Sequence, residues 1–252
     1  MKRALASAIN ARPHELGGAL AAFATAFTMF SAYAILRPIR ETMGITSGLQ
    51  TLPALFWGTF AGMLLVQPVY GWLTSRYRRS AFLPWVYLFF VLNILGFYAW
   101  FNLQEDHTWI ARAYFIWVSV FVLFVVAVFW SLMADVFSRE QAGRLFGFVA
   151  AGLSTGGLFG PFLGARLAQP IGTINLLLVS AALLTVSLGC MMLVLRWHRR
   201  HGENTAPGED RDAQLGGTAL AAFRQVARSP YLALIALFVF LLTWVSTFLY
   251  LE

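Results

Sequence analysis

Seven stretches of this chain contain no Asp, Glu, Lys or Arg, and each is at least 21 residues long. The hydrocarbon core of a membrane is about 30 Å thick, which an α-helix crosses in roughly 20 residues. A charge near the membrane centre costs at least ~2.5–3.5 kcal/mol, so spanning helices exclude charge. The pattern predicts an all-α integral membrane protein with seven transmembrane helices, at residues 16–36, 42–75, 80–104, 113–134, 145–165, 167–195 and 229–251.

The alternative is a soluble protein with seven buried helices, and the composition argues against it. Hydrophobic residues make up 59% and charged residues 12% of the chain, against about 45–50% and about 25% in soluble domains. A soluble helix also shows a polar face, and these stretches show none. The composition excludes a disordered chain, a disulfide scaffold and an ordinary cytosolic enzyme. The expected partner is the lipid bilayer.

The basic residues indicate how the chain is oriented in the membrane. The formal net charge is +7, which we assign to orientation because basic residues gather on the cytoplasmic side; we expect no nucleic-acid partner. With a cytoplasmic N-terminus, fourteen basic residues lie inside, and four lie outside: Arg37, Arg40, Arg112 and Arg166. The sequence therefore predicts a multi-pass protein with a cytoplasmic N-terminus.

A polar segment separates six spans from a seventh. It is basic at its start and contains Pro, Gly and acidic residues further on, as solvated linkers do. Near its end, residues 219–228 alternate apolar and basic residues, as a helix at the membrane surface would. We predict a six-helix N-terminal half at 1–195, a cytoplasmic linker at 196–230, and a seventh transmembrane helix at 231–252 that starts a second half.

The fifth span carries glycines four residues apart, at Gly152, Gly156, Gly160 and Gly164. They share one helix face, where the absence of side chains lets another helix approach to backbone contact. Pro161, beside them, removes a backbone hydrogen bond and permits a kink. We predict close packing of this helix, in a form suited to two bundles that rock against each other.

No pattern of residues favours an enzyme. Residues 152–156 fit the nucleophile pattern G-x-S-x-G, but that pattern requires a strand-to-helix turn and a nearby His. All four histidines lie outside the charge-free stretches. Metal-ligand spacings and phosphate-binding Gly-Lys-Ser/Thr loops are absent from the sequence. We therefore expect no catalytic residues, no cofactor and no metal.

The cytoplasmic loop between the second and third spans is strongly basic. Gly71 precedes Arg76, Arg78 and Arg79, and Asp135 lies at the cytoplasmic end of the fourth span. We interpret these residues as a charge lock that holds one closed arrangement and that a transport cycle must break and remake. The alternative is an orientation signal alone.

Tyr33, Arg37, Arg40 and Glu41 lie at the outer end of the first span. Charges within a membrane are usually functional, and Arg binds phosphate or carboxylate oxygens bidentately. These four residues are the candidate substrate-binding site for an anionic small molecule. Pro38 disfavours helical geometry in the residue before it, so we expect a break in the helix there. The alternative is an interfacial anchor, paired to Glu41 or to lipid phosphate.

Two motifs resemble the major facilitator superfamily. The basic loop is similar to a degenerate form of its motif G-x-x-x-D-R-x-G-R-R, with the residues Gly71-x-x-x-Ser75-Arg76-x-Arg78-Arg79. The fifth span is similar to the glycine-proline motif of its exchangers, with the residues Gly156-Gly157-x-x-Gly160-Pro161-x-x-Gly164. The resemblance covers six spans and the linker. It implies a major-facilitator-type half bundle plus the first helix of the second half.

A narrower resemblance is to the ATP/ADP translocase-like branch. The end of the first span resembles its L-R-x-x-K-D segment, as Leu36-Arg37-x-x-Arg40-Glu41. The connection of the fourth and fifth spans is also similar, at Phe129-Trp130-Ser131-x-x-Ala134 and Glu140-x-Ala142-x-Arg144-Leu145-Phe146. This resemblance implies an antiporter of the bacterial inner membrane for a nucleotide-like solute.

The leading hypothesis is a secondary active transporter that works by alternating access on a small anionic solute, with a nucleotide as one candidate. One alternative is a proton-coupled efflux carrier, which requires a titratable acid buried in mid-span. The alternative from another class is a truncated membrane fragment without transport. A cavity between two six-helix halves cannot close with one half and a single helix. We therefore expect a C-terminal half or a second copy as partner, and no transport by the chain alone.

Overall fold

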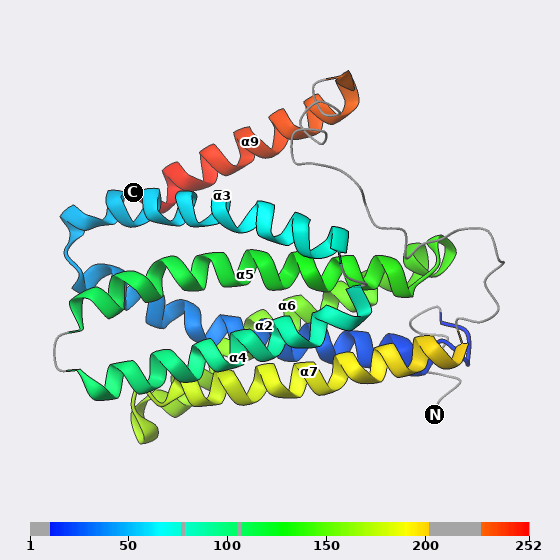
Figure 1. The fold of residues 1–252 in the computed structure, drawn as a ribbon, viewed down its shortest axis with the longest axis horizontal. Helices are drawn as coiled ribbons and strands as arrows, with labels where there is room; N and C mark the ends of the chain where they lie inside the picture. Colours follow the sequence, from blue (N-terminus) through cyan, green and yellow to red (C-terminus); the bar gives the residue numbers. More distant parts are fainter. Residues whose placement is uncertain (1–10, 77–78, 105–106, 202–227, 252) are drawn as a thin grey trace. The chain divides into compact units, whose positions relative to one another are not determined.

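The computed structural model describes residues 11–76, 79–104, 107–201 and 228–251 (Figure 1). These residues are mostly helical, as the sequence predicts. In chain order the elements are α2 (Leu16–Thr46), a short 3-10 turn (Leu49–Thr51), α3 (Leu52–Arg76), α4 (Arg79–Leu103), α5 (Thr108–Val136), α6 (Arg139–Ile171), α7 (Leu176–His201) and α9 (Pro230–Leu251).

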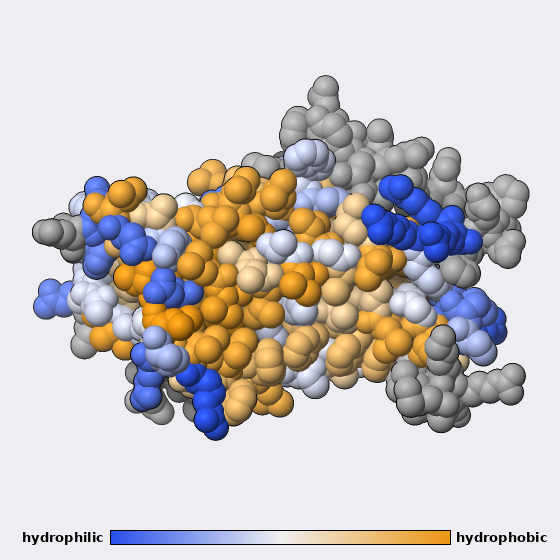
Figure 2. Space-filling model, turned by 90° about the horizontal axis from the view of Figure 1, so that it is seen from below, coloured by the Kyte–Doolittle hydropathy of each residue, from blue (hydrophilic) through white to orange (hydrophobic). Residues whose placement is uncertain are grey.

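In the described part of the chain, five helices are long and apolar enough to cross a membrane: α2, α4, α5, α6 and α7. In α3 and α9 the apolar stretches of described residues are shorter, at Leu52–Val66 and Pro230–Ser246. The face in Figure 2 is apolar across its middle, and hydrophilic side chains gather toward its two ends. A helix satisfies its own backbone groups, as a membrane requires. The multi-pass helical fold is confirmed, and the count of seven spans stays a prediction.

The chain divides into two compact units. One comprises Met1–Leu64 and Arg78–Ala213, and the other comprises Leu65–Tyr77 and Gln214–Glu252. The first unit therefore contains α2, α4, α5, α6, α7 and the first half of α3. The predicted boundaries at 195 and 230 stay predictions: α7 extends to His201, and the predicted surface helix at 219–228 lies almost wholly outside the described residues.

Helix α2 is the centre of the first unit. It packs most extensively on α6, and also on α7 and α5 (Figure 1). Two serines of α7 donate hydrogen bonds to backbone carbonyls of α2. The Ser180 hydroxyl donates to the Ala32 carbonyl at 2.9 Å. The Ser187 hydroxyl donates to the Thr25 carbonyl at 3.0 Å. The buried face of α2 consists largely of small residues, which let neighbouring helices approach: Gly18, Ala19, Ala22, Ala26, Ser31, Ala32 and Ala34.

The predicted break at Pro38 is wrong. Helix α2 runs through Pro38 to Thr46, ten residues beyond the charge-free stretch. Leu36 and Ile39, on either side of the proline, are both buried, and the Tyr114 hydroxyl of α5 lies 3.4 Å from the Leu36 carbonyl oxygen. Packing on both sides outweighs the local preference of the residue before a proline. As a result, Arg37 and Glu41 lie one turn apart on one helix face.

Candidate functional site

Arg40 is held by contacts from two helices. Its Nη1 donates to the Ser119 hydroxyl of α5 at 2.9 Å, and its Nη2 donates to Glu41 Oε1 at 2.5 Å. The guanidinium carbon lies 5.0 Å from the centre of the Phe115 ring, a cation–π distance. The side chain is only 17% exposed, and its buried Nε has no hydrogen-bond partner among the described residues.

Glu41 joins Arg40 to Arg37. The Nε of Arg37 lies 3.9 Å from the same oxygen, Glu41 Oε1, that accepts from Arg40. Unlike Arg40, Arg37 is 60% exposed. The structure therefore brings three of the four predicted binding residues together. The fourth, Tyr33, lies one turn earlier on α2, and its ring packs against Phe30 at 5.4 Å.

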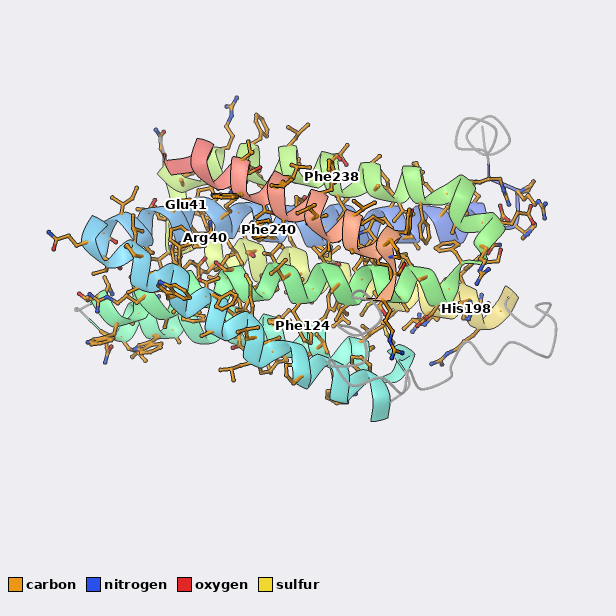
Figure 3. The ribbon with its side chains drawn as sticks, turned by 90° about the horizontal axis from the view of Figure 1, so that it is seen from above. Arg40, Glu41, Phe124, His198, Phe238 and Phe240 are labelled. Atoms are coloured by element: carbon orange, nitrogen blue, oxygen red, sulfur yellow. The ribbon has the colours of Figure 1, made fainter. Side chains whose placement is uncertain are left out.

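Ser119 is a site residue that the sequence analysis missed. It is buried in α5, and its hydroxyl also donates to the Phe115 carbonyl at 2.9 Å. Arg112 marks the polar end of α5, and Ser119 lies seven residues further along the helix, about 10 Å deeper at 1.5 Å per residue. The Arg40 guanidinium therefore reaches into the apolar length of α5, where charge is costly. Figure 3 shows Arg40 and Glu41 near one end of the bundle, with His198 of α7 at the other.

The predicted glycine face of α6 packs on the backbone of α2. A Cβ on Gly156 would overlap the Phe27 carbonyl oxygen, and one on Gly152 would lie 2.7 Å from the Phe23 carbonyl oxygen. A Cβ on Gly160 would lie 2.6 Å from the Ala34 Cβ. Gly164 is looser, with its nearest neighbour, an Ile35 carbon, at 3.8 Å. Pro161 lies within the continuous α6 helix. The conformational role of this face stays a prediction.

The predicted charge lock is described only in part. Gly71 lies on α3 and is exposed, and Asp135 lies at the end of α5 and is half-buried. Arg78 lies outside the described residues, as do the side chains of Arg76 and Arg79. The lock therefore stays a prediction.

A second polar cluster, which the sequence analysis did not assign, lies where α2 and α6 begin. Glu15 is only 1% exposed, and Arg144 donates to both of its carboxylate oxygens, at 3.0 and 3.1 Å. The Gln141 amide donates at 3.1 Å and the Arg12 backbone N–H at 2.8 Å. Burial alone would raise the pKa of Glu15, but the hydrogen bonds from Arg144, Arg12 and Gln141 outweigh it and hold the pKa below its ordinary value.

A capping box at the start of α6 positions this cluster. The Ser138 hydroxyl accepts from the Gln141 backbone N–H at 3.3 Å, and the Gln141 side-chain oxygen accepts from the Ser138 N–H at 2.9 Å. The Gln141 amide nitrogen is thereby turned toward Glu15. The S-x-x-Q spacing of Ser138 and Gln141 was a readable sequence signal for this start. From α7, the Trp197 indole donates to the His14 carbonyl at 3.0 Å.

Two sequence features that bear on catalysis can be placed in the described residues. These residues contain no group of three or more His, Cys, Asp or Glu side chains that could hold a metal ion. Ser154 of the G-x-S-x-G pattern is exposed within α6, whereas a nucleophile of this type lies at a strand-to-helix turn.

Comparison with known proteins agrees with this arrangement of packed apolar helices. The sequence model of the family described as Major Facilitator Superfamily matches residues 16–252. The chain belongs to the major facilitator superfamily. The family, together with the long apolar helices, makes the chain a multi-pass membrane protein of a transporter family.

Two curated proteins are similar to part of the chain. The ADP,ATP carrier protein 2 of Chlamydia pneumoniae is 26% identical over 167 residues, covering 52% of this chain and 30% of the relative. The ADP,ATP carrier protein 2 of Chlamydia trachomatis serovar D is 24% identical over 172 residues, covering 54% and 31%. The matched part of the chain thus spans less than a third of the length of these relatives. No solved structure matches the chain.

Proposed function

We propose that this chain forms part of an alternating-access carrier for a small anionic solute that bears phosphate or carboxylate groups. The observation that carries the proposal is the pair of arginines gathered around Glu41 at one end of α2, with Arg40 half-buried against α5. The guanidinium of Arg forms two parallel hydrogen bonds to an oxyanion. A carrier that must strip water from such an anion requires this kind of charge within its apolar part.

The names of the relatives make a nucleotide the first candidate for the solute. Both relatives are named ADP,ATP carriers, and the region around Arg37, Arg40 and Glu41 resembles the corresponding segment of that branch. A nucleoside diphosphate or triphosphate also presents several oxyanion oxygens to two adjacent arginines. We infer exchange of such a solute as the transport mode.

We further propose how the protein is assembled and oriented. The six leading spans form one half of the carrier, and a second half comes from a C-terminal half or from a second copy of the chain. In such carriers the two halves enclose the substrate site between them. The excess of basic residues on one side favours a cytoplasmic N-terminus in a bacterial inner membrane. A proton-coupled efflux carrier is not favoured, because its apolar substrates would leave the arginine pair unused.

The test is nucleotide exchange by the native gene product in liposomes. Vesicles preloaded with ADP are given labelled ATP outside, and uptake is compared with that of vesicles without ADP. We expect saturable uptake that depends on internal ADP. Arg40→Lys retains the charge but loses the two parallel hydrogen bonds that a guanidinium can donate. It should lower the exchange rate at least tenfold.

Arg12→Lys is the matched control. Arg12 is also paired with a glutamate, Glu140, at 2.8 Å, but at the far end of α2. It should keep the exchange rate of the parent. Parental exchange by both Arg37→Lys and Arg40→Lys would show that the arginines are interfacial anchors and would contradict the anion site.

A further inference from the structure

The Glu41 carboxylate lies between the two arginines of the candidate site. One of its oxygens, Oε1, lies 2.5 Å from Arg40 Nη2 and 3.9 Å from Arg37 Nε. A carboxylate oxygen and a phosphate oxygen are interchangeable as acceptors for guanidinium groups. Glu41 therefore pairs with both arginines, and a soluble anion must compete with Glu41 for them.

Arg40 is fixed independently of Glu41. The Ser119 hydroxyl donates to the Phe115 carbonyl, so its lone pairs face the Arg40 Nη1 that donates to it. The Phe115 ring lies against the guanidinium. If Glu41 turns away, these contacts keep Arg40 in place, and a buried charge without a partner is strongly unfavourable. The site then requires another anion.

We propose that Glu41 is a resident anion that the oxyanion of the transported solute displaces from Arg37 and Arg40, and that Ser119 is the positioning residue that holds Arg40 for it. This inference rests on the proposed function. Its first consequence is that an anion always neutralises the charge of the two arginines. Competition from Glu41 lowers the apparent affinity for the solute. The return of Glu41 to the arginines expels the solute at the end of a half-cycle.

The test is binding of inorganic pyrophosphate to the purified native gene product in phosphatidylcholine nanodiscs. Pyrophosphate carries the oxyanions and lacks the nucleoside. We expect Glu41→Gln, which removes the competing charge, to lower the Kd for pyrophosphate about tenfold. Glu140→Gln is the matched control: it makes the same charge change at the other end of the bundle and should keep the parental Kd.

The second variant tests Ser119. Ser119→Ala should raise the Kd for pyrophosphate several-fold, because Arg40 loses the hydrogen bond that positions it, and Ser119→Thr should restore the parental value. A purely structural role would lower the melting temperature of Ser119→Ala and leave the Kd of its folded fraction unchanged. That result would overturn the positioning role.

The outcomes separate this inference from the proposed function. Parental nucleotide exchange together with a Kd for Glu41→Gln that is unchanged or raised would overturn the resident anion alone. Tighter pyrophosphate binding by Glu41→Gln without nucleotide exchange by the parent would support the resident anion and contradict the nucleotide. Absence of pyrophosphate binding in every variant would overturn the inference. Loss of the tighter binding in phosphatidylglycerol nanodiscs would assign the arginines to lipid headgroups and overturn it as well.

Discussion

At the scale of single residues, the described structure contains two ionic clusters near opposite ends of α2, and they differ in kind. Glu15 is fully buried and has four donor contacts, from Arg144, Gln141 and the Arg12 backbone. The Glu15 carboxylate is thus fully hydrogen-bonded, and its network stabilises one arrangement. In the second cluster Arg37 is mostly exposed, and it meets Glu41 only at 3.9 Å. The second keeps donor capacity for a ligand.

Glu15 should make stability dependent on pH in the acid range. Because its pKa in the folded state is lowered, its stabilising contribution is complete above its ordinary pKa of 4.5 and is lost as the pH falls through the folded value. We expect Glu15→Gln to melt several degrees below the parent at pH 7, with the difference shrinking as the pH is lowered below 4.5. Thermal unfolding in detergent measures both. An equal difference at all pH values would contradict the charged network.

Residues differ in how far the sequence reveals their role. Arg37, Arg40 and Glu41 are conspicuous because charges beside an apolar stretch require a reason. Ser119 is not, because a serine in an apolar helix commonly bonds its own backbone, as this one also does. Glu15 and Arg144 each flank a charge-free stretch by one residue, but their pairing depends on how α2 and α6 pack, which spacing along the chain does not give.

At the scale of helices, the contact of α6 with α2 was predictable from the glycine spacing, although its partner was not. The four-residue period marks one face, and the structure shows that this face meets the backbone from Phe23 to Ser31. The predicted break at Pro38 was wrong because packing of the buried residues on both sides outweighs a local backbone preference.

Two glycine-to-alanine substitutions on this face should change the melting temperature differently. Gly156→Ala places a methyl group on the Phe27 carbonyl oxygen, so we expect a lower melting temperature and poor assembly. Gly164→Ala has ordinary contact distance to Ile35 and gains up to about 1 kcal/mol of helix propensity, so it should melt at or above the parental temperature. Fluorescence-detected chromatography after heating compares the two. Equal melting temperatures would show that close backbone packing is not what orders this face.

At the scale of the whole molecule, the basic residues predict the orientation in the membrane. The prediction rests on fourteen basic residues on one side against four on the other. In a background with the lone Cys190 replaced by Ala, an impermeant thiol reagent on intact cells should label Asp106→Cys and leave Glu209→Cys unlabelled. Mass-shift labelling before and after lysis measures this. The reverse pattern would place the N-terminus outside.

The central position of α2 also has a consequence for synthesis at the ribosome. Ser31 lies next to the Gly156 carbonyl, 125 residues later in the chain. At roughly 5–20 residues per second, α2 waits about 6–25 s in the bilayer before that partner has been made. During this interval α4 and α5 are made, but the surface of α2 that α6 covers has no α6 to pack against. The helix on which α6 packs is thus in the membrane well before that partner has been made.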